Sequence, residues 1–187
     1  MDDARITALA LRAREGDRVA AGEFVAVTQG QVWRLLVHLA DPSVAEELAQ
    51  ETYERALGSL RRYRGDAPAR SWLLSIARRV AADHLRRRAR RPVRPAALAD
   101  DDRPLGHAPG SDPAESVAVR HALGALDPDR REAFVLTQVL GLSYDEAAAV
   151  ARCPIGTIRS RVARARADLV EALGERPTAA ERPHRSG

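Results

Sequence analysis

The 187-residue sequence has no lysine and no asparagine, so all 30 of its basic residues are arginines. Because the codons for both missing residues are AT-rich, we infer a GC-rich genome. Arginine suits flat, forked contacts with phosphate and guanine, but codon bias alone accounts for this preference. What the arginines do must therefore be judged from where they lie in the chain.

Cysteine is nearly absent as well, which excludes two kinds of site. The single Cys153 cannot form an intramolecular disulfide or supply a cysteine-based zinc site. No apolar run approaches the roughly 20 residues needed to cross a membrane. The acidic N-terminus lacks the basic region of a signal peptide, so we expect a soluble, cytoplasmic protein that does not contact a membrane.

Aromatic residues make up only 4% of the chain, whereas hydrophobic residues make up 45%. A core must then be built mainly from leucine, valine and alanine, which favours helices because strands prefer aromatic and β-branched residues. Short breaks that contain proline or glycine divide the chain into segments. Within a segment, apolar residues recur at helical spacing, as do Leu73, Ile76 and Val80. The predicted fold class is therefore all-α.

A change of composition divides the chain. Residues 91–113 contain five prolines, two glycines and the acidic run Asp100 to Asp102. Such a segment cannot bury enough apolar surface to become ordered. We predict two small helical domains, residues 1–91 and 114–174, joined by a flexible linker at 92–113. Residues 175–187 are predicted to be a disordered tail.

The second helical block contains the pattern of a helix-turn-helix. Ser143 and Glu146 form an S-x-x-E capping box, which predicts a helix over 144–151, and Pro154 marks the start of a longer helix. Ile158, Val162, Ala165 and Leu169 should face the core. The opposite face would enter the major groove of DNA.

That exposed face is part of the stretch CPIGTIRSRVARAR, which has four arginines in eight positions. Ser160 and Arg164 would meet base edges, and Thr157, Arg159, Arg161 and Arg166 would hold phosphates. The alternative is a solvated charged helix. The capping box and the tight turn favour DNA binding.

The first block contains an acidic stripe and an arginine-rich helix. Glu47, Glu51 and Glu54 share one helix face with Glu46 and Gln50, without the histidines of a di-iron site; this is either a solvated face or a docking face for a basic partner. Eight arginines follow between Arg78 and Arg94. With Trp72, the loop from Asp66 to Ser71 and possible contacts from His84, they are typical of a surface for melted DNA.

No nucleophile–base pair, phosphate loop or metal cluster is evident, so we predict neither catalysis nor a cofactor. The family resemblance that follows implies a promoter-specificity subunit. The alternative is a stand-alone helix-turn-helix regulator that binds an operator as a dimer.

Two stretches resemble a known family. DPSVAEELAQETYERAL followed by ARSWLLSIARRVAADHLRRR is similar to region 2 of the extracytoplasmic-function (ECF) sigma factors of bacterial RNA polymerase, within the sigma-70 family. LDPDRREAFVLTQVLGLSYDEAAAVARCPIGTIRSRVARAR resembles region 4 of that family, in particular its actinobacterial sigma factor C subgroup.

The resemblance implies three binding surfaces. Region 2 would bind the clamp helices of the largest polymerase subunit through Glu46, Glu47, Gln50 and Glu51. It would melt and read the −10 promoter element through Asp66, Ala69, Arg70, Ser71, Trp72, Arg78, Arg79, Asp83, His84 and Arg86. Region 4 would bind the polymerase flap and read the −35 element through the helix that carries Thr157 to Arg164.

The resemblance also leaves open an anti-sigma factor as a partner and a compact, inactive form of the free chain. Two positions differ from those usual in the family. Relatives have asparagine where this chain has Arg79, which suggests a different base preference at −10. They have glycine where it has Arg152, so a left-handed backbone there would cost this chain about 1 kcal/mol.

Overall fold

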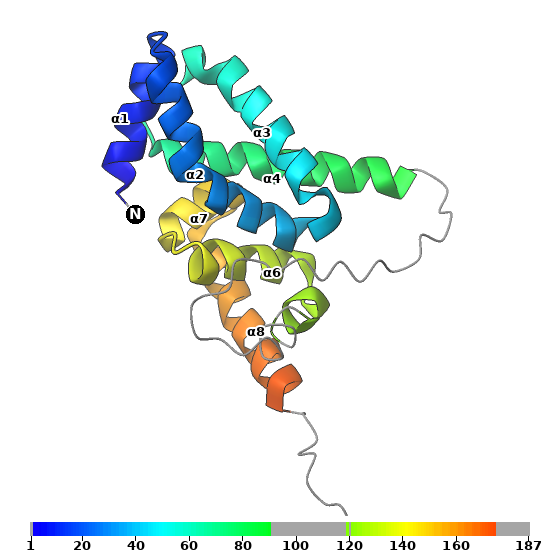
Figure 1. Ribbon diagram of the computed structural model, residues 1–187. Coiled ribbons are helices and arrows are strands. Elements are labelled where there is room, and N and C mark those ends of the chain that lie inside the picture. Colours follow the sequence, from blue (N-terminus) through cyan, green and yellow to red (C-terminus); the bar gives the residue numbers. More distant parts are fainter. Residues whose placement is uncertain (1, 91–118, 120, 175–187) are drawn as a thin grey trace, which may run out of the picture.

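The structure is a computed structural model that describes residues 2–90, 119 and 121–174 (Figure 1). These residues are helical with short connections and include no strand, which confirms the all-α prediction. The predicted flexible linker at 92–113 and the predicted tail at 175–187 lie outside the described residues.

The N-terminal part consists of α1 (Asp3–Arg14), α2 (Arg18–Leu39), α3 (Ala45–Ser59) and α4 (Ala69–Arg90), with 3-10 turns at Pro42–Val44 and Leu60–Arg62. Carboxylates set where its first helices begin. The side chain of Asp2 accepts hydrogen bonds from the first backbone N–H groups of α1, and Asp17 does the same for α2. Each satisfies donors that a helix start leaves without partners.

The C-terminal part contains a helical segment at 121–125, then α6 (Pro128–Phe134), a π-helical turn at Val135–Val139, α7 (Tyr144–Ala151) and α8 (Ile155–Gly174). The predicted capping box is present, because Ser143 and Glu146 each bond the other's backbone N–H. The predicted helix over 144–151 has the same limits in the structure.

The apolar residues that the sequence places in the core are buried in both parts. Leu73, Ile76 and Val80 of α4 and Ile158 and Val162 of α8 are at most 5% exposed. Ala165 and Leu169, further along α8, pack on a smaller cluster with Ala122, Leu123 and Leu126.

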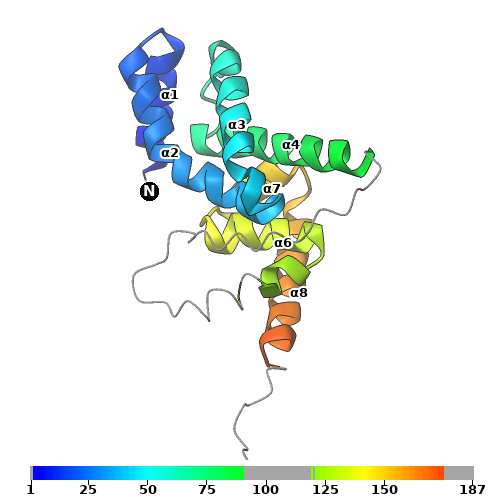
Figure 2. The ribbon, with the colours of Figure 1, turned by 45° about the vertical axis from the view of Figure 1, so that its right-hand side comes forward.

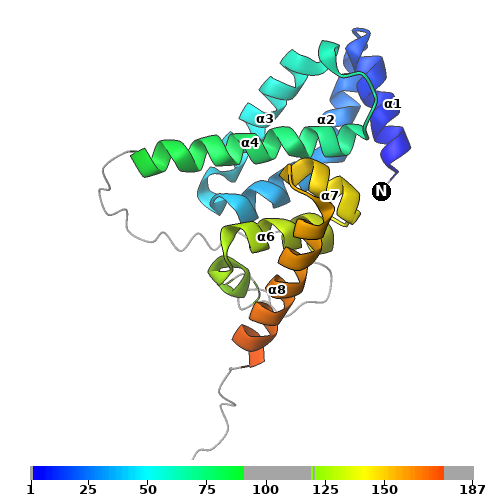
Figure 3. The same ribbon diagram turned by 180° about the vertical axis from the view of Figure 1, so that it is seen from behind.

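The two parts pack against each other. Figure 3 shows α7 beneath α4, and Figures 1 and 2 show α6 beneath α2. One apolar cluster is continuous across the contact and includes Leu35 and Val80 on one side and Leu136 and Val150 on the other. The two predicted domains are therefore in direct contact, which we call the closed arrangement.

Candidate nucleic-acid interface

The exposed face of α8 carries the residues that the sequence assigns to base reading. Ser160 and Arg164 are exposed, as is Arg159 beside them. Neither arginine forms an ion pair within the described part of the chain. Since Ile158 and Val162 anchor the opposite side, this face presents two free guanidinium groups to solvent.

The other predicted phosphate contacts on α8 have partners inside the same domain. The guanidinium of Arg161 forms an ion pair with Asp129 and is half-buried. Arg166 donates a hydrogen bond to Gln138 at 2.8 Å. Thr157 is half-buried, and its carbonyl accepts a hydrogen bond from Ser160 at 3.0 Å. Arg161 and Arg166 would have to give up these contacts to hold phosphates.

The turn between α7 and α8 has one unusual residue. Arg152 is the only non-glycine residue with a positive φ in the described chain, with φ 56° and ψ 47°. This is the left-handed conformation expected at the position where relatives have glycine. An L-residue there is strained by about 1 kcal/mol.

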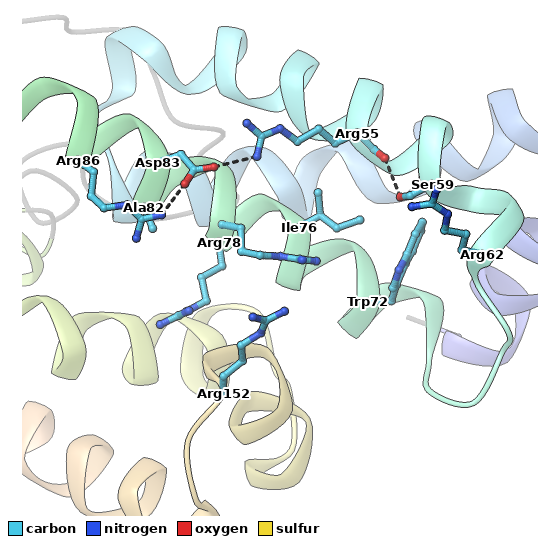
Figure 4. Close-up of a pocket in the computed structure, with 11 residues that line it drawn as sticks. Arg55, Ser59, Arg62, Trp72, Ile76, Arg78, Ala82, Asp83, Arg86 and Arg152 are labelled. Atoms are coloured by element: carbon cyan, nitrogen blue, oxygen red, sulfur yellow. Dashed lines mark hydrogen bonds and ion pairs between the residues drawn. The ribbon is translucent and has the colours of Figure 1, made fainter.

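A cavity of about 560 Å³ lies beside α4, and several predicted −10 residues line it (Figure 4). Trp72, Arg78, Arg79, Asp83 and Arg86 come from α4, while Arg152 reaches in from the other domain. Trp72 is half-buried and packs on Tyr63, with ring centroids 4.9 Å apart. The structure thus brings an indole ring and an arginine cluster to one place.

Asp83 fixes one edge of this cavity. Its carboxylate pairs with Arg55 of α3 at 2.9 Å and with Arg86 of α4 (Figure 4). The hydrogen bond from Arg55, followed by that from Arg86, holds the pKa of Asp83 below its usual value. Asp83 therefore stays ionised and ties α3 to α4, while its neighbour His84 is half-buried.

Three of the predicted −10 residues are buried in the closed arrangement, although promoter contact would need an accessible surface. Ala69, Arg70 and Ser71 are at most 7% exposed. Arg70 donates hydrogen bonds to Gln31, at 2.7 Å, and to the backbone carbonyl of Leu140 in the other domain. The predicted loop from Asp66 to Ser71 is shorter in the structure, because α4 begins at Ala69, and Asp66 in this loop is exposed.

Arg78 also faces the other domain. It forms an ion pair with Glu132 of α6, which is 6% exposed. Burial raises the pKa of the Glu132 carboxyl, while the hydrogen bond from Arg78 opposes that rise. In the closed arrangement Arg78 therefore stabilises a buried carboxylate of the other domain.

The predicted polymerase-binding face on α3 is partly engaged within the molecule. Glu46 and Glu47 are exposed. Glu51 is half-buried and pairs with Arg55 and, at 3.3 Å, with Arg87 of α4. Gln50 is exposed and donates to Glu54 at 3.0 Å. Glu46 and Glu47 are thus the freest acidic groups of the set.

Sequence reasoning missed Glu132, Gln31 and Asp129, whose partners lie far along the chain. No local pattern marks such residues, because their role depends on which helix faces them after packing. Within the ranges described, there is no group of acidic, histidine or cysteine side chains placed to hold a metal ion. No helix there is long and apolar enough to span a membrane.

Comparison with known proteins agrees with this architecture. The family described as "Sigma-70 region 2" matches residues 24–91, and "Sigma-70, region 4" matches residues 116–169. The chain is 48% identical over 174 residues to the ECF RNA polymerase sigma factor SigC of Mycobacterium tuberculosis, which covers 90% of this chain and 91% of that protein. It is 33% identical to the RNA polymerase sigma-H factor of Pseudomonas aeruginosa, over 87% of this chain and 90% of that one.

Solved structures show the same likeness. The sigma factor RpoE of Bartonella quintana, in complex with the anti-sigma factor NepR, matches with a TM-score of 0.66 and 27% identity, over 83% of this chain and 97% of that one. CnrH in complex with the cytosolic domain of CnrY also gives a TM-score of 0.66, at 30% identity over 92% of this chain and 98% of that one.

Two helical domains that match regions 2 and 4 in this order define a sigma factor of the sigma-70 type. With its identity to SigC over nine-tenths of its length, the chain belongs to the ECF family of RNA polymerase sigma factors. The stand-alone regulator is not favoured by these matches.

Proposed function

We propose that this sigma factor reads the −35 promoter element through α8, with Arg164 and Ser160 on base edges and Arg159 on a phosphate. The observation that carries the proposal is the exposed position of these three side chains opposite a buried apolar stripe, with both arginines free of ion pairs among the described residues. Arginine pairs with guanine through two parallel hydrogen bonds. Thr157, Arg161 and Arg166 would add phosphate contacts once Asp129 and Gln138 release the two arginines.

For the −10 element we propose the surface of α4 and the loop before it. Trp72 would stack a base, and Arg79, Asp83, His84 and Arg86 would line the path of the strand. Asp66, Ala69, Arg70, Ser71 and Arg78 complete the surface. Because Arg70 and Arg78 contact the other domain, this function requires the two domains to separate.

For core polymerase we propose α3 as the docking helix. Glu46 and Glu47 offer exposed carboxylates, Gln50 lies beside them, and Glu51 would contribute if its arginine partners move. The partner surface on the clamp helices should then be basic. An anti-sigma factor is a further proposed partner, as in the complexes of the related solved structures.

In this proposal the domain limits are residues 1–91 and 114–174, with a linker at 92–113 and a tail at 175–187. The protein acts in the cytoplasm and performs no chemistry of its own, because the polymerase makes the RNA.

In vitro transcription tests the proposal. The purified chain is added to sigma-free core polymerase from a GC-rich bacterium on a fragmented genomic template. We expect transcripts from discrete start sites, with shared elements upstream near −35 and −10. Binding to a palindromic site without transcription would instead favour the stand-alone regulator.

A further inference from the structure

The cavity beside α4 has the size and composition of a ligand site. Its volume of about 560 Å³ lies within the range of small-molecule pockets. Its walls come from α3, from α4 and from Arg152 at the end of α7, so both domains build it. Figure 4 shows Arg152 reaching from the turn after α7 toward α4. The complete cavity exists only in the closed arrangement.

The charge of the cavity is strongly positive. Its lining includes six arginines and a single carboxylate, Asp83; the arginines are Arg55, Arg62, Arg78, Arg79, Arg86 and Arg152. Three of the arginines form ion pairs: Arg55 and Arg86 with Asp83, and Arg78 with Glu132. The other three, Arg62, Arg79 and Arg152, have no ion-pair partner within the described residues.

Of these three arginines, Arg79 belongs to the N-terminal domain and Arg152 to the C-terminal domain. Burial lowers the pKa of Arg79, and the positive charges of Arg152 and Arg55 lower it further. Asp83 opposes this lowering only in part, so the closed arrangement brings like charges together with incomplete compensation. An anion in the cavity would convert this repulsion into attraction.

The backbone at Arg152 adds a second, independent observation. A bulky side chain is held here at φ 56°, where glycine would be free of strain. Strained positions of this kind are concentrated at ligand-binding sites. The guanidinium group of this strained residue lines the cavity.

The cavity also has an apolar part. Trp72, Ile76 and Ala82 line it beside the arginines. Contact with Tyr63 holds one side of the Trp72 indole. A flat aromatic ring can stack on an indole, whereas an inorganic anion would make no use of this surface.

We propose that the cavity binds a nucleoside polyphosphate, with its base on Trp72 and its phosphates between Arg79 and Arg152. Such a ligand bridges the two domains and stabilises the closed arrangement. It occupies the surface proposed for the −10 element, so it and melted promoter DNA exclude each other.

Isothermal titration calorimetry on the full chain, without polymerase or promoter, tests this. ATP, GTP, tripolyphosphate and a short single-stranded DNA are titrated separately at constant ionic strength. We expect a nucleoside triphosphate to bind one to one and more tightly than tripolyphosphate. Because polymerase is absent, the result does not depend on whether the chain directs transcription.

Variants locate the site. Arg79→Gln and Arg152→Gly should each weaken binding by about tenfold, the loss expected for one charge-assisted contact. Arg5→Gln, which removes an exposed charge on α1, should bind like the unchanged protein. Arg152→Gly relieves strain, so a folding defect should not obscure its result, and circular dichroism checks this.

Several results would overturn the proposal. Absence of saturable binding to either triphosphate at millimolar concentration would do so. Equal weakening by Arg5→Gln would show attraction to net charge only. If Arg152→Gly left the affinity unchanged, the ligand would not bridge the two domains. If tripolyphosphate bound with equal affinity, the nucleoside would not contribute to binding. Binding of the DNA alone would leave the cavity as part of the promoter surface.

Discussion

At Arg152 the backbone conformation favours glycine, although the residue carries a long charged side chain. Its left-handed conformation ends α7 and turns the chain into α8. Glycine adopts this conformation without strain, although it loses more backbone entropy on folding. The arginine side chain therefore comes at a cost in stability.

We predict that Arg152→Gly raises the free energy of unfolding by up to about 1 kcal/mol, because the strain exceeds the added entropy of glycine. Urea unfolding of the full chain measures this. Gly141→Ala is the matched control, since Gly141 has φ 69° and no atom within 4 Å of an added Cβ. It should destabilise by a similar amount, and a stabilising Gly141→Ala would contradict the strain argument.

Arg164 is the residue that we expect to set promoter preference. Replacing it by alanine should cost about 1–3 kcal/mol in binding of the preferred −35 element and relax the preference at one base pair. Transcription from a library randomised over the −35 element measures both. Arg159→Ala should instead weaken all sequences about equally, as loss of a phosphate contact does. An unchanged preference in Arg164→Ala would place the base contact elsewhere on α8.

At the scale of single elements, the capping box fixes where α7, the first helix of the DNA-binding motif, begins. Ser143→Ala should lower the free energy of unfolding by about 1 kcal/mol, because the N–H of Glu146 loses its acceptor. Thermal unfolding of the full chain checks this.

Ser75 offers a control for that prediction. Its hydroxyl donates to the carbonyl of Trp72 inside α4, at 2.7 Å, and serines bonded in this way add little to a helix. Ser75→Ala should change stability much less than Ser143→Ala. Equal effects of the two variants would argue against a special role of the cap.

The acidic helix α3 is the element that we expect to bind core polymerase. Glu47 is exposed, so Glu47→Gln should leave stability nearly unchanged while lowering affinity for core polymerase. Binding to core polymerase at two salt concentrations measures this, and the difference should shrink at high salt. Glu23→Gln, an equally exposed change on α2, is the control. Equal affinities for both variants would exclude Glu47 from the docking face.

The whole molecule is held closed by the apolar contact between its domains and by two arginines of α4. Arg70 reaches the carbonyl of Leu140, and Arg78 neutralises the buried Glu132. A buried carboxylate that loses its counter-charge is costly, and exposing it to water removes that cost.

We therefore predict that Arg78→Ala shifts the chain toward a more extended form, seen as a larger radius of gyration in small-angle X-ray scattering. The double variant Arg78→Ala/Glu132→Ala should be more compact than the single one, because no charge is then buried alone. Arg34→Ala, at an exposed position on α2, should leave the radius unchanged. An unchanged radius in Arg78→Ala would show that apolar packing alone holds the domains together.

Local signals account for the parts of the fold that were predicted well. The helix of α7 followed from a capping box and α8 from a proline and a regular apolar stripe, because such signals act within a few residues. Helical spacing likewise identified the buried side of α4. The exposure of Ser160 and Arg164 on α8 followed from the same periodicity, since the face opposite a buried stripe must meet solvent or a partner.

The partners of the arginines could not be predicted in this way. Residues 54 positions apart form the ion pair of Arg78 with Glu132, and residues 70 apart form the bond from Arg70 to Leu140. The sequence offered Arg70 and Arg78 as DNA contacts. In the closed arrangement both are engaged between the domains, because the two packed surfaces bring acceptors to them.

The sequence by itself determined the all-helical class, the helix-turn-helix and the two-part order that marks an ECF sigma factor, because helix caps, apolar spacing and motif order are all written locally. Only the tertiary structure decided that the two domains close on each other. It also decided that Arg70 and Arg78 are engaged between them, and that Arg79 and Arg152 line one cavity. These contacts depend on the complementary shape and charge of surfaces that are far apart in the chain.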